Sequence, residues 1–322
     1  MFIFQLAHAP TPHPVEPAHT TPPVQTTPAH QTPAQIAATQ QAAYNETRAG
    51  LVRTGMSPWT QTINCTAQIE QQRGAVGRAL GNNPQAQTAL ANYHPVGVVV
   101  PEAEILRRMP AEERQQFAHH GQVNGYTLRN GTILIRAGQS PAQQTEVMRH
   151  EMLHGVAENL RHNQITYEGH NNAQIPHAAL EAAVQYTTAT SMPANTHTPM
   201  AYPAHVATMA LLEHQVGRPA LQQAITTGNF TQVQHTVDEH LGAGTFQTAM
   251  GHLEHNDPAR AYNTLYMPMH NINPRGVETF INTNPVMVRC NNTISEQQAA
   301  QRLANTPTPA TVPVIVPATR RT

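Results

Sequence analysis

The chain has 322 residues, of which 39% are hydrophobic and 11% are charged, and its formal net charge is −1. This length suits one large domain or two small ones, with enough apolar residues for a core. The near-neutral charge provides no basic surface for nucleic acid or anionic lipid, so neither is expected as a partner. The longest apolar runs fall well short of the roughly 20 residues that cross a bilayer, and no membrane span is expected.

The first residues are apolar but lack a positively charged segment, and we do not interpret them as a secretory signal peptide. Cys65 and Cys290 are the only cysteines and are far apart, so no disulfide framework or cysteine-rich zinc site is expected.

All 18 basic residues are arginine, although lysine is normally one of the commonest amino acids. Lysine is the site of ubiquitination, and its depletion resembles that of bacterial toxins and effectors that enter eukaryotic cytosol. This absence favours a secreted or translocated protein, with a cytoplasmic one as the alternative.

Composition divides the chain into five parts. Residues 1–38 are rich in Pro, Thr, His and Gln with almost no large apolar side chains, which predicts a disordered arm. Residues 39–94 are rich in Ala, Gln and Arg and predict two or three helices. Residues 95–270 carry the patterns of a main domain, 271–304 are a C-terminal extension, and 305–322 are a second disordered segment.

The main domain begins with strand signals. The run Val98-Val99-Val100 lies between prolines and predicts a short strand. Further on, the segments 125–128 and 132–136 flank an Asn130-Gly131 turn and predict a β-hairpin. A small sheet is therefore expected ahead of the helices.

A helix is predicted from Ser140 to about Leu160, because Pro141 suits the first helical position and Gln143 completes a capping box with Ser140. Further helical sequence covers the ranges 176–188, 204–216, 219–227 and 231–253. A small mixed sheet followed by helices predicts an α+β fold.

This helix contains His150-Glu151-Met152-Leu153-His154, an HExxH sequence. A spacing of four residues places both imidazoles on one helical face, where they can bind one Zn²⁺ ion, and Glu151 lies beside them as a candidate general base. Zinc held in this way leaves a position for water, lowers the pKa of that water and polarises a scissile carbonyl. The pattern points to peptide-bond hydrolysis.

The third zinc ligand is less well defined. The metzincin pattern needs Gly at 157 and His at 160, but these positions hold Ala157 and Leu160. An aspartate ligand is disfavoured because the chain has only two aspartates, both far along the sequence. Glutamate remains: Glu158 on the same helix, Glu168 in a loop rich in Gly and Asn, or Glu181 on the next predicted helix, with Glu181 fitting best.

The segment from Glu181 to Thr188 resembles the second helix of gluzincins, the HExxH-plus-Glu metallopeptidases, in particular compact bacterial members that read roughly Glu-Gly-x-x-x-Tyr-x-Thr. Glu181 then takes the ligand position, and Tyr186 and Thr188 take the later ones, while Ala182 replaces the usual Gly. The resemblance covers about residues 95–250. It implies a zincin-like domain with His150, His154 and Glu181 as zinc ligands.

Gluzincins also use a Tyr, His or Arg to stabilise the oxyanion of the transition state. The candidates here are Tyr202, Tyr262, Tyr266 and Arg260. The sequence does not choose among them, and Tyr202 is taken as the working candidate.

Together these patterns predict a zinc metallopeptidase acting on a protein or peptide, possessing the α+β zincin-like fold and delivered as a bacterial effector or toxin with a host protein as substrate. Two alternatives remain open. One is a non-catalytic, His-rich zinc-binding or interaction protein, since the chain has 20 histidines. The other is a housekeeping peptidase that stays inside the cell.

Overall fold

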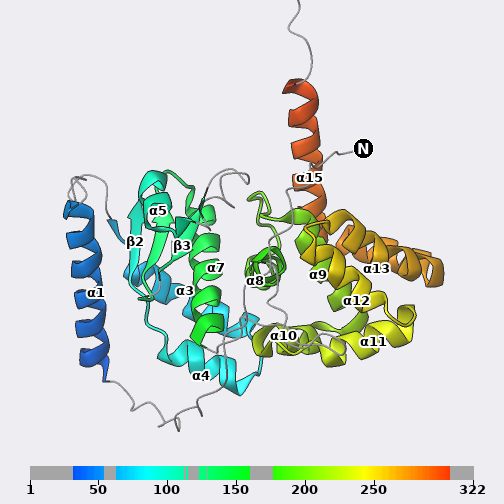
Figure 1. Cartoon of the computed structure of the whole chain (residues 1–322), viewed down its shortest axis with the longest axis horizontal. Helices are drawn as coiled ribbons and strands as arrows, with labels where there is room; N and C mark the ends of the chain where they lie inside the picture. Colours follow the sequence, from blue (N-terminus) through cyan, green and yellow to red (C-terminus); the bar gives the residue numbers. More distant parts are fainter. Residues whose placement is uncertain are drawn as a thin grey trace, which may run out of the picture.

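A computed structural model describes residues 32–53, 63–111, 114, 123–128, 130–159 and 177–304. Helices predominate, and one small mixed sheet accompanies them (Figure 1). The expectation of a small mixed sheet combined with helices is confirmed. The expected segment 305–322 and residues 1–31 of the expected arm lie outside the described residues, whereas residues 33–38 belong to the first helix.

The first half of the chain contains the sheet and the helices around it. Its elements are α1 (Pro33–Arg53), β1 (Ile63–Asn64), α3 (Thr66–Ala79), α4 (Pro84–Asn92), β2 (Gly97–Val100), α5 (Glu102–Arg108), β3 (Gly125–Thr127), β4 (Ile133–Arg136) and α7 (Pro141–Asn159).

The second half is helical throughout the part that the structure describes. Its elements are α8 (His177–Ser191), α9 (Pro203–Val216), α10 (Arg218–Thr227), α11 (Thr231–Leu241), α12 (Thr245–Glu254), α13 (Pro258–Ile272), α14 (Pro274–Thr283) and α15 (Pro285–Ala304).

The sheet has the strand order β1-β2-β4-β3, so β3 is an edge strand. Strands β2 and β4 are parallel, and β3 and β4 form the predicted antiparallel hairpin, with Tyr126 opposite Leu134. Gly131 of the Asn-Gly turn has a φ of +80°, a left-handed conformation that glycine adopts without a steric penalty.

Alternate side chains of the two central strands enter different cores, as the two-residue period of a strand requires. Val99 and Ile135 pack with α3 and α7 on one face. Val98 and Leu134 pack on the other face with Ile105 of α5. Both faces are covered, which explains why these strands are apolar without alternation.

Helix α7 begins as the sequence predicts. The Ser140 backbone N–H donates to Gln143 Oε1 at 3.0 Å, and the Gln143 N–H donates to Ser140 Oγ at 3.3 Å, which is a complete capping box. Met148 and Met152 are buried against the sheet side. These contacts fix the rotation of α7 and turn its other face toward α8.

Helices α8 to α15 share one hydrophobic core with α9 at its centre, where His205 to Leu212 are all buried. In Figure 1, α8 lies between α7 on one side and α9, α12 and α13 on the other. Val277, Met287 and Cys290 of the expected C-terminal extension belong to this core. The boundary expected at residue 270 is therefore not a boundary in the packing.

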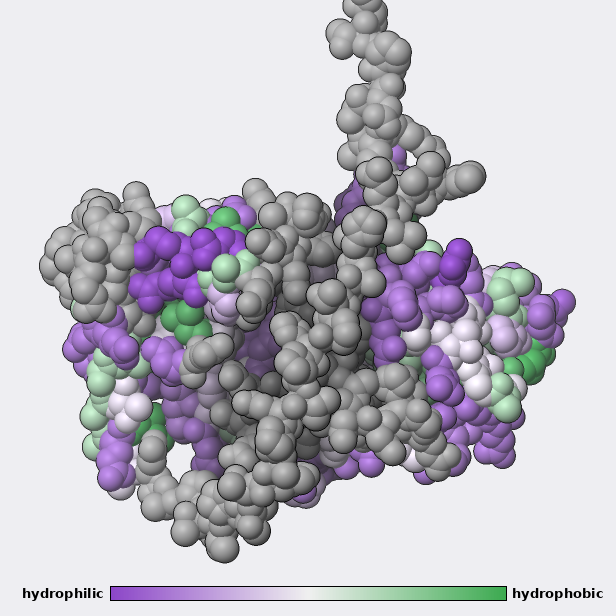
Figure 2. Space-filling model, in the orientation of Figure 1, coloured by the Kyte–Doolittle hydropathy of each residue, from purple (hydrophilic) through white to green (hydrophobic). Residues whose placement is uncertain are grey.

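The face of the molecule in Figure 2 is mainly hydrophilic over the described residues. Among the residues that the structure describes, the large apolar side chains that are exposed are Ile63, Met267 and Ile272. Among the described helices, none combines the length and the apolar character needed to cross a bilayer.

Candidate metal centre

Three side chains from α7 and α8 converge at the junction of the two halves. His150 Nε2 lies 3.1 Å from Glu181 Oε2, and His154 Nε2 lies 3.2 Å from Glu181 Oε1. The two histidine Nε2 atoms are 2.9 Å apart. Among the described residues, this is the group of His, Cys, Asp and Glu side chains whose ligand atoms are close enough to share one metal ion.

The spacing of these donor atoms fits a small tetrahedral ion. Zinc bonds to histidine nitrogen and carboxylate oxygen are about 2.0–2.2 Å long, so neighbouring ligand atoms around a tetrahedron lie about 3.3–3.6 Å apart. The histidine–histidine separation of 2.9 Å is slightly shorter, and so are the separations of 3.1 and 3.2 Å from the histidines to the two different oxygens of Glu181. Two imidazoles and one carboxylate are also a donor set that zinc accepts in catalytic sites.

The three side chains are largely but not completely buried. Exposed fractions of the side chains are 13% for His150, 21% for His154 and 8% for Glu181. Burial acts to raise the pKa of Glu181, but the charges of His154 and His150 and the hydrogen bonds from both rings hold that pKa well below its usual value. Glu181 is therefore a carboxylate ready to bind a cation.

Glu151 is buried beside the three ligands and points to a different partner. Thr127 Oγ1, at the end of β3, lies 2.9 Å from Glu151 Oε2 and 3.1 Å from its backbone oxygen. A Cβ at Gly125 would lie 2.8 Å from Glu151 Oε1, so only glycine leaves room for this carboxylate. Burial raises the pKa of Glu151, with the neighbouring Glu181 adding to it, while His150, His154 and Thr127 act to lower it.

Tyr202 is the oxyanion candidate that lies near these carboxylates. It precedes α9 in a left-handed conformation, with φ 50° and ψ 48°, which is uncommon for a residue with a side chain. Burial raises the pKa of its hydroxyl, and the charges of Glu181 and Glu151 raise it further. The phenol therefore keeps its proton at neutral pH and can donate a hydrogen bond. The ring of His205 packs edge-on against it.

The remaining oxyanion candidates have other surroundings. Tyr262 and Tyr266 stack on each other along α13, and Arg260 pairs with Asp257 at the start of that helix. Tyr186 and Thr188, the later positions of the gluzincin pattern, are buried side chains of α8. The Tyr186 hydroxyl donates to Glu213 of α9, and Thr188 donates to the Val184 carbonyl.

No protein-family model, curated protein or solved structure matches the chain.

The alternative third ligands fall where the structure gives no side chain. Glu168 lies outside the described residues, and the side chain of Glu158 is not described although its backbone belongs to α7. Glu181 is thus the glutamate that the described part of the chain brings to the two histidines.

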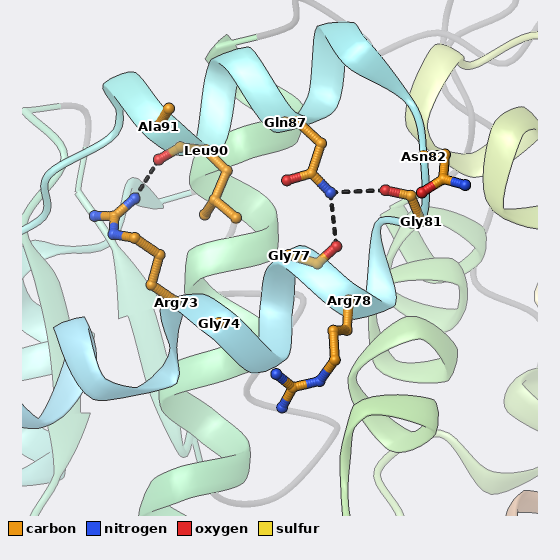
Figure 3. A pocket seen from close by; sticks show the side chains of 9 residues that line it. All are labelled: Arg73, Gly74, Gly77, Arg78, Gly81, Asn82, Gln87, Leu90 and Ala91. Atoms are coloured by element: carbon orange, nitrogen blue, oxygen red, sulfur yellow. Dashed lines mark hydrogen bonds between the residues drawn. The ribbon is translucent and has the colours of Figure 1, made fainter.

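A groove between α3 and α4, with a volume of about 580 Å³, is separate from the metal centre. Figure 3 shows Gln87 donating across it to the Gly77 and Gly81 carbonyls, and Arg73 bonded to the Leu90 carbonyl. Arg73 also pairs with Glu70. The charge of Arg73 is compensated in this way, and we assign the groove no ligand.

Gly155, directly after the second histidine, allows close packing against Tyr93. A Cβ there would lie 2.1 Å from the Tyr93 ring. We expect Gly155→Ala to lower the free energy of unfolding by about 1–3 kcal/mol, since an overpacked core outweighs the gain in helix propensity. Urea unfolding of the metal-free protein measures this change.

Gly251 of α12 is the matched control, because a Cβ there would meet nothing within 4 Å. Gly251→Ala should raise the free energy of unfolding by about 0.5–1 kcal/mol, the usual gain inside a helix. Equal effects at both positions would show that the Tyr93 contact does not constrain α7.

Proposed function

We propose that this chain is a zinc-dependent peptidase. The observation that carries the proposal is the convergence of His150, His154 and Glu181, from two helices, beside the buried carboxylate of Glu151. A metal site that is only structural has no need of a fourth, non-ligating carboxylate, whereas hydrolysis needs a general base next to the ion.

Each residue has a defined task in this proposal. His150, His154 and Glu181 would hold the ion, which acts as a Lewis acid that polarises a carbonyl and acidifies water. Glu151 takes a proton from the attacking water and delivers it to the leaving amine. Thr127 fixes one oxygen of Glu151. Tyr202 donates a hydrogen bond to the carbonyl oxygen as that oxygen gains negative charge.

The edge position of β3 suits a peptide substrate. Gly125 and Thr127 are on this strand and next to Glu151, and an edge strand offers backbone hydrogen bonds to an extended segment. A peptide paired there would run past the proposed general base. We therefore favour a protein or peptide over a small amide as the substrate class.

Metal content and chelation test the proposal. We expect the purified protein to contain one zinc ion per chain and to cleave an unfolded protein such as casein. Removing the ion with 1,10-phenanthroline should abolish cleavage, and adding zinc back should restore it. Several weakly held ions spread over the histidines, with no cleavage, would instead support the alternative of a zinc-sequestering protein.

We further propose delivery into a host cell as an effector or toxin. The support is the complete absence of lysine among 18 basic residues, which removes the sites of ubiquitination. Finding the protein in the cytosol of host cells during infection would support this route. Retention inside the producing cell would favour a housekeeping peptidase.

A further inference from the structure

A buried ion pair links the HExxH helix to the last helix of the described chain. Arg289 Nη2 of α15 lies 2.6 and 2.5 Å from the two carboxylate oxygens of Glu146 on α7. Gln185 of α8 donates to Glu146 Oε1 at 2.7 Å, and the Thr198 hydroxyl donates to Glu146 Oε2 at 2.5 Å. All four side chains are buried.

Glu146 of the ion pair and its partner Gln185 each lie one helical turn from a candidate metal ligand, on α7 and α8. Glu146 precedes His150 by four residues, and Gln185 follows Glu181 by four residues, a rise of about 6 Å in each helix. The Glu146–Gln185 bond and the His150–Glu181 contact run side by side between α7 and α8. Any shift of one helix along the other would break both.

The same arginine also holds the segment that leads to Tyr202. Arg289 Nε donates to the Thr198 carbonyl at 2.6 Å. One turn later on α15, the Thr293 hydroxyl accepts from the Met200 backbone N–H at 2.9 Å. The chain is thus fixed to α15 two residues before Tyr202 enters its left-handed conformation.

From these contacts we propose that Arg289 is a positioning residue for the metal centre, acting through Glu146, Gln185 and Thr198. This inference rests on the proposed function. Its planar guanidinium bonds directly to α7, which carries the two histidines and Glu151, and to the segment that leads to Tyr202. Through Glu146 it is also linked to α8, which carries Glu181. Groups that hydrogen-bond directly to metal ligands typically contribute about 10- to 100-fold in metal affinity or activity, and this range is the upper bound for a residue that acts through the helices carrying the ligands.

If Arg289 only stabilised the fold, a folded variant without it would keep wild-type zinc affinity. A double variant distinguishes this structural role from the positioning role. Glu146→Met with Arg289→Met removes both charges, a replacement that buried ion pairs often tolerate without loss of stability. If Arg289 positions the site, this variant should bind zinc more weakly, by up to about 100-fold, and show a lower kcat. The visible spectrum of the Co²⁺-loaded variant should also change, because that spectrum reports the coordination geometry.

Arg289→Lys is the second variant, since it keeps a paired charge in the core but cannot bridge Glu146 and Thr198 with a planar fork. We expect a smaller loss of zinc affinity and of kcat than in the double variant. Glu104→Gln on α5 is the control: it weakens the ion pairs that another buried glutamate makes with the more exposed Arg107 and Arg108, and it should leave zinc affinity unchanged.

The outcomes are distinct. If a folded variant without the guanidinium keeps wild-type zinc affinity, kcat and Co²⁺ spectrum, the positioning role is overturned while the proposed function stands. If the wild-type chain itself binds no zinc, the proposed function is overturned and this inference with it.

Discussion

Replacing Glu151 with glutamine should leave zinc bound and reduce peptide hydrolysis by about 10²- to 10⁴-fold, the range that a general base contributes. The amide keeps the shape of the side chain and can still contact Thr127, but it cannot accept the proton of water at neutral pH. Zinc analysis and the kcat of casein or peptide cleavage, measured on the same preparation, check this result.

Glu278→Gln provides the matched control, because it makes the same chemical change on α14 at a side chain that is 59% exposed. Its activity and zinc content should equal those of the wild type. Zinc-loaded Glu151→Gln protein with unchanged activity would contradict the mechanism and leave the metal without a catalytic partner.

Replacing Glu181 with alanine should remove the zinc ion at concentrations where the wild type is saturated. Two histidines alone do not complete the three-ligand set of a catalytic zinc site. The loss in affinity should exceed the roughly 10- to 100-fold that removal of a supporting group causes. Competition with a chromogenic chelator measures the affinity.

Glu168→Ala is the comparison for this experiment, because Glu168 was the alternative ligand in the sequence. It should keep wild-type affinity. If Glu181→Ala retained one tightly bound zinc and Glu168→Ala lost it, the third ligand would be Glu168.

The helix of the HExxH motif was predictable because its signals are local. Ser140 and Gln143 cap each other within three residues, and the Asn130-Gly131 turn sets the hairpin before it. The spacing of His150 and His154 then follows from the geometry of one helix. Glu181 needed more, since its approach depends on how α8 crosses α7, and its place on the next predicted helix together with the gluzincin resemblance favoured it.

Other contacts in and around the candidate site have no local signal in the sequence. Arg289 and Glu146 are separated by 143 residues, and no periodicity links positions so distant. Thr127 contacts Glu151 because β3 lies at the sheet edge beside α7. Tyr202 was one of four candidates, and its proximity to Glu181 depends on how α9 packs against α8, which sequence patterns do not encode.

The position of α8 has a consequence for the whole molecule when metal is present. Its Glu181 side faces the histidines of α7, while Ala182, Ala183 and Tyr186 belong to the core of the helical half. Val184 of the same helix packs in the core of the first half, so a bound ion would add a second link where the two cores already meet. By thermodynamic linkage, zinc at 100 times its dissociation constant would stabilise the folded chain by about 2.7 kcal/mol. Chelation removes this link and should accordingly lower the free energy of unfolding by the same amount.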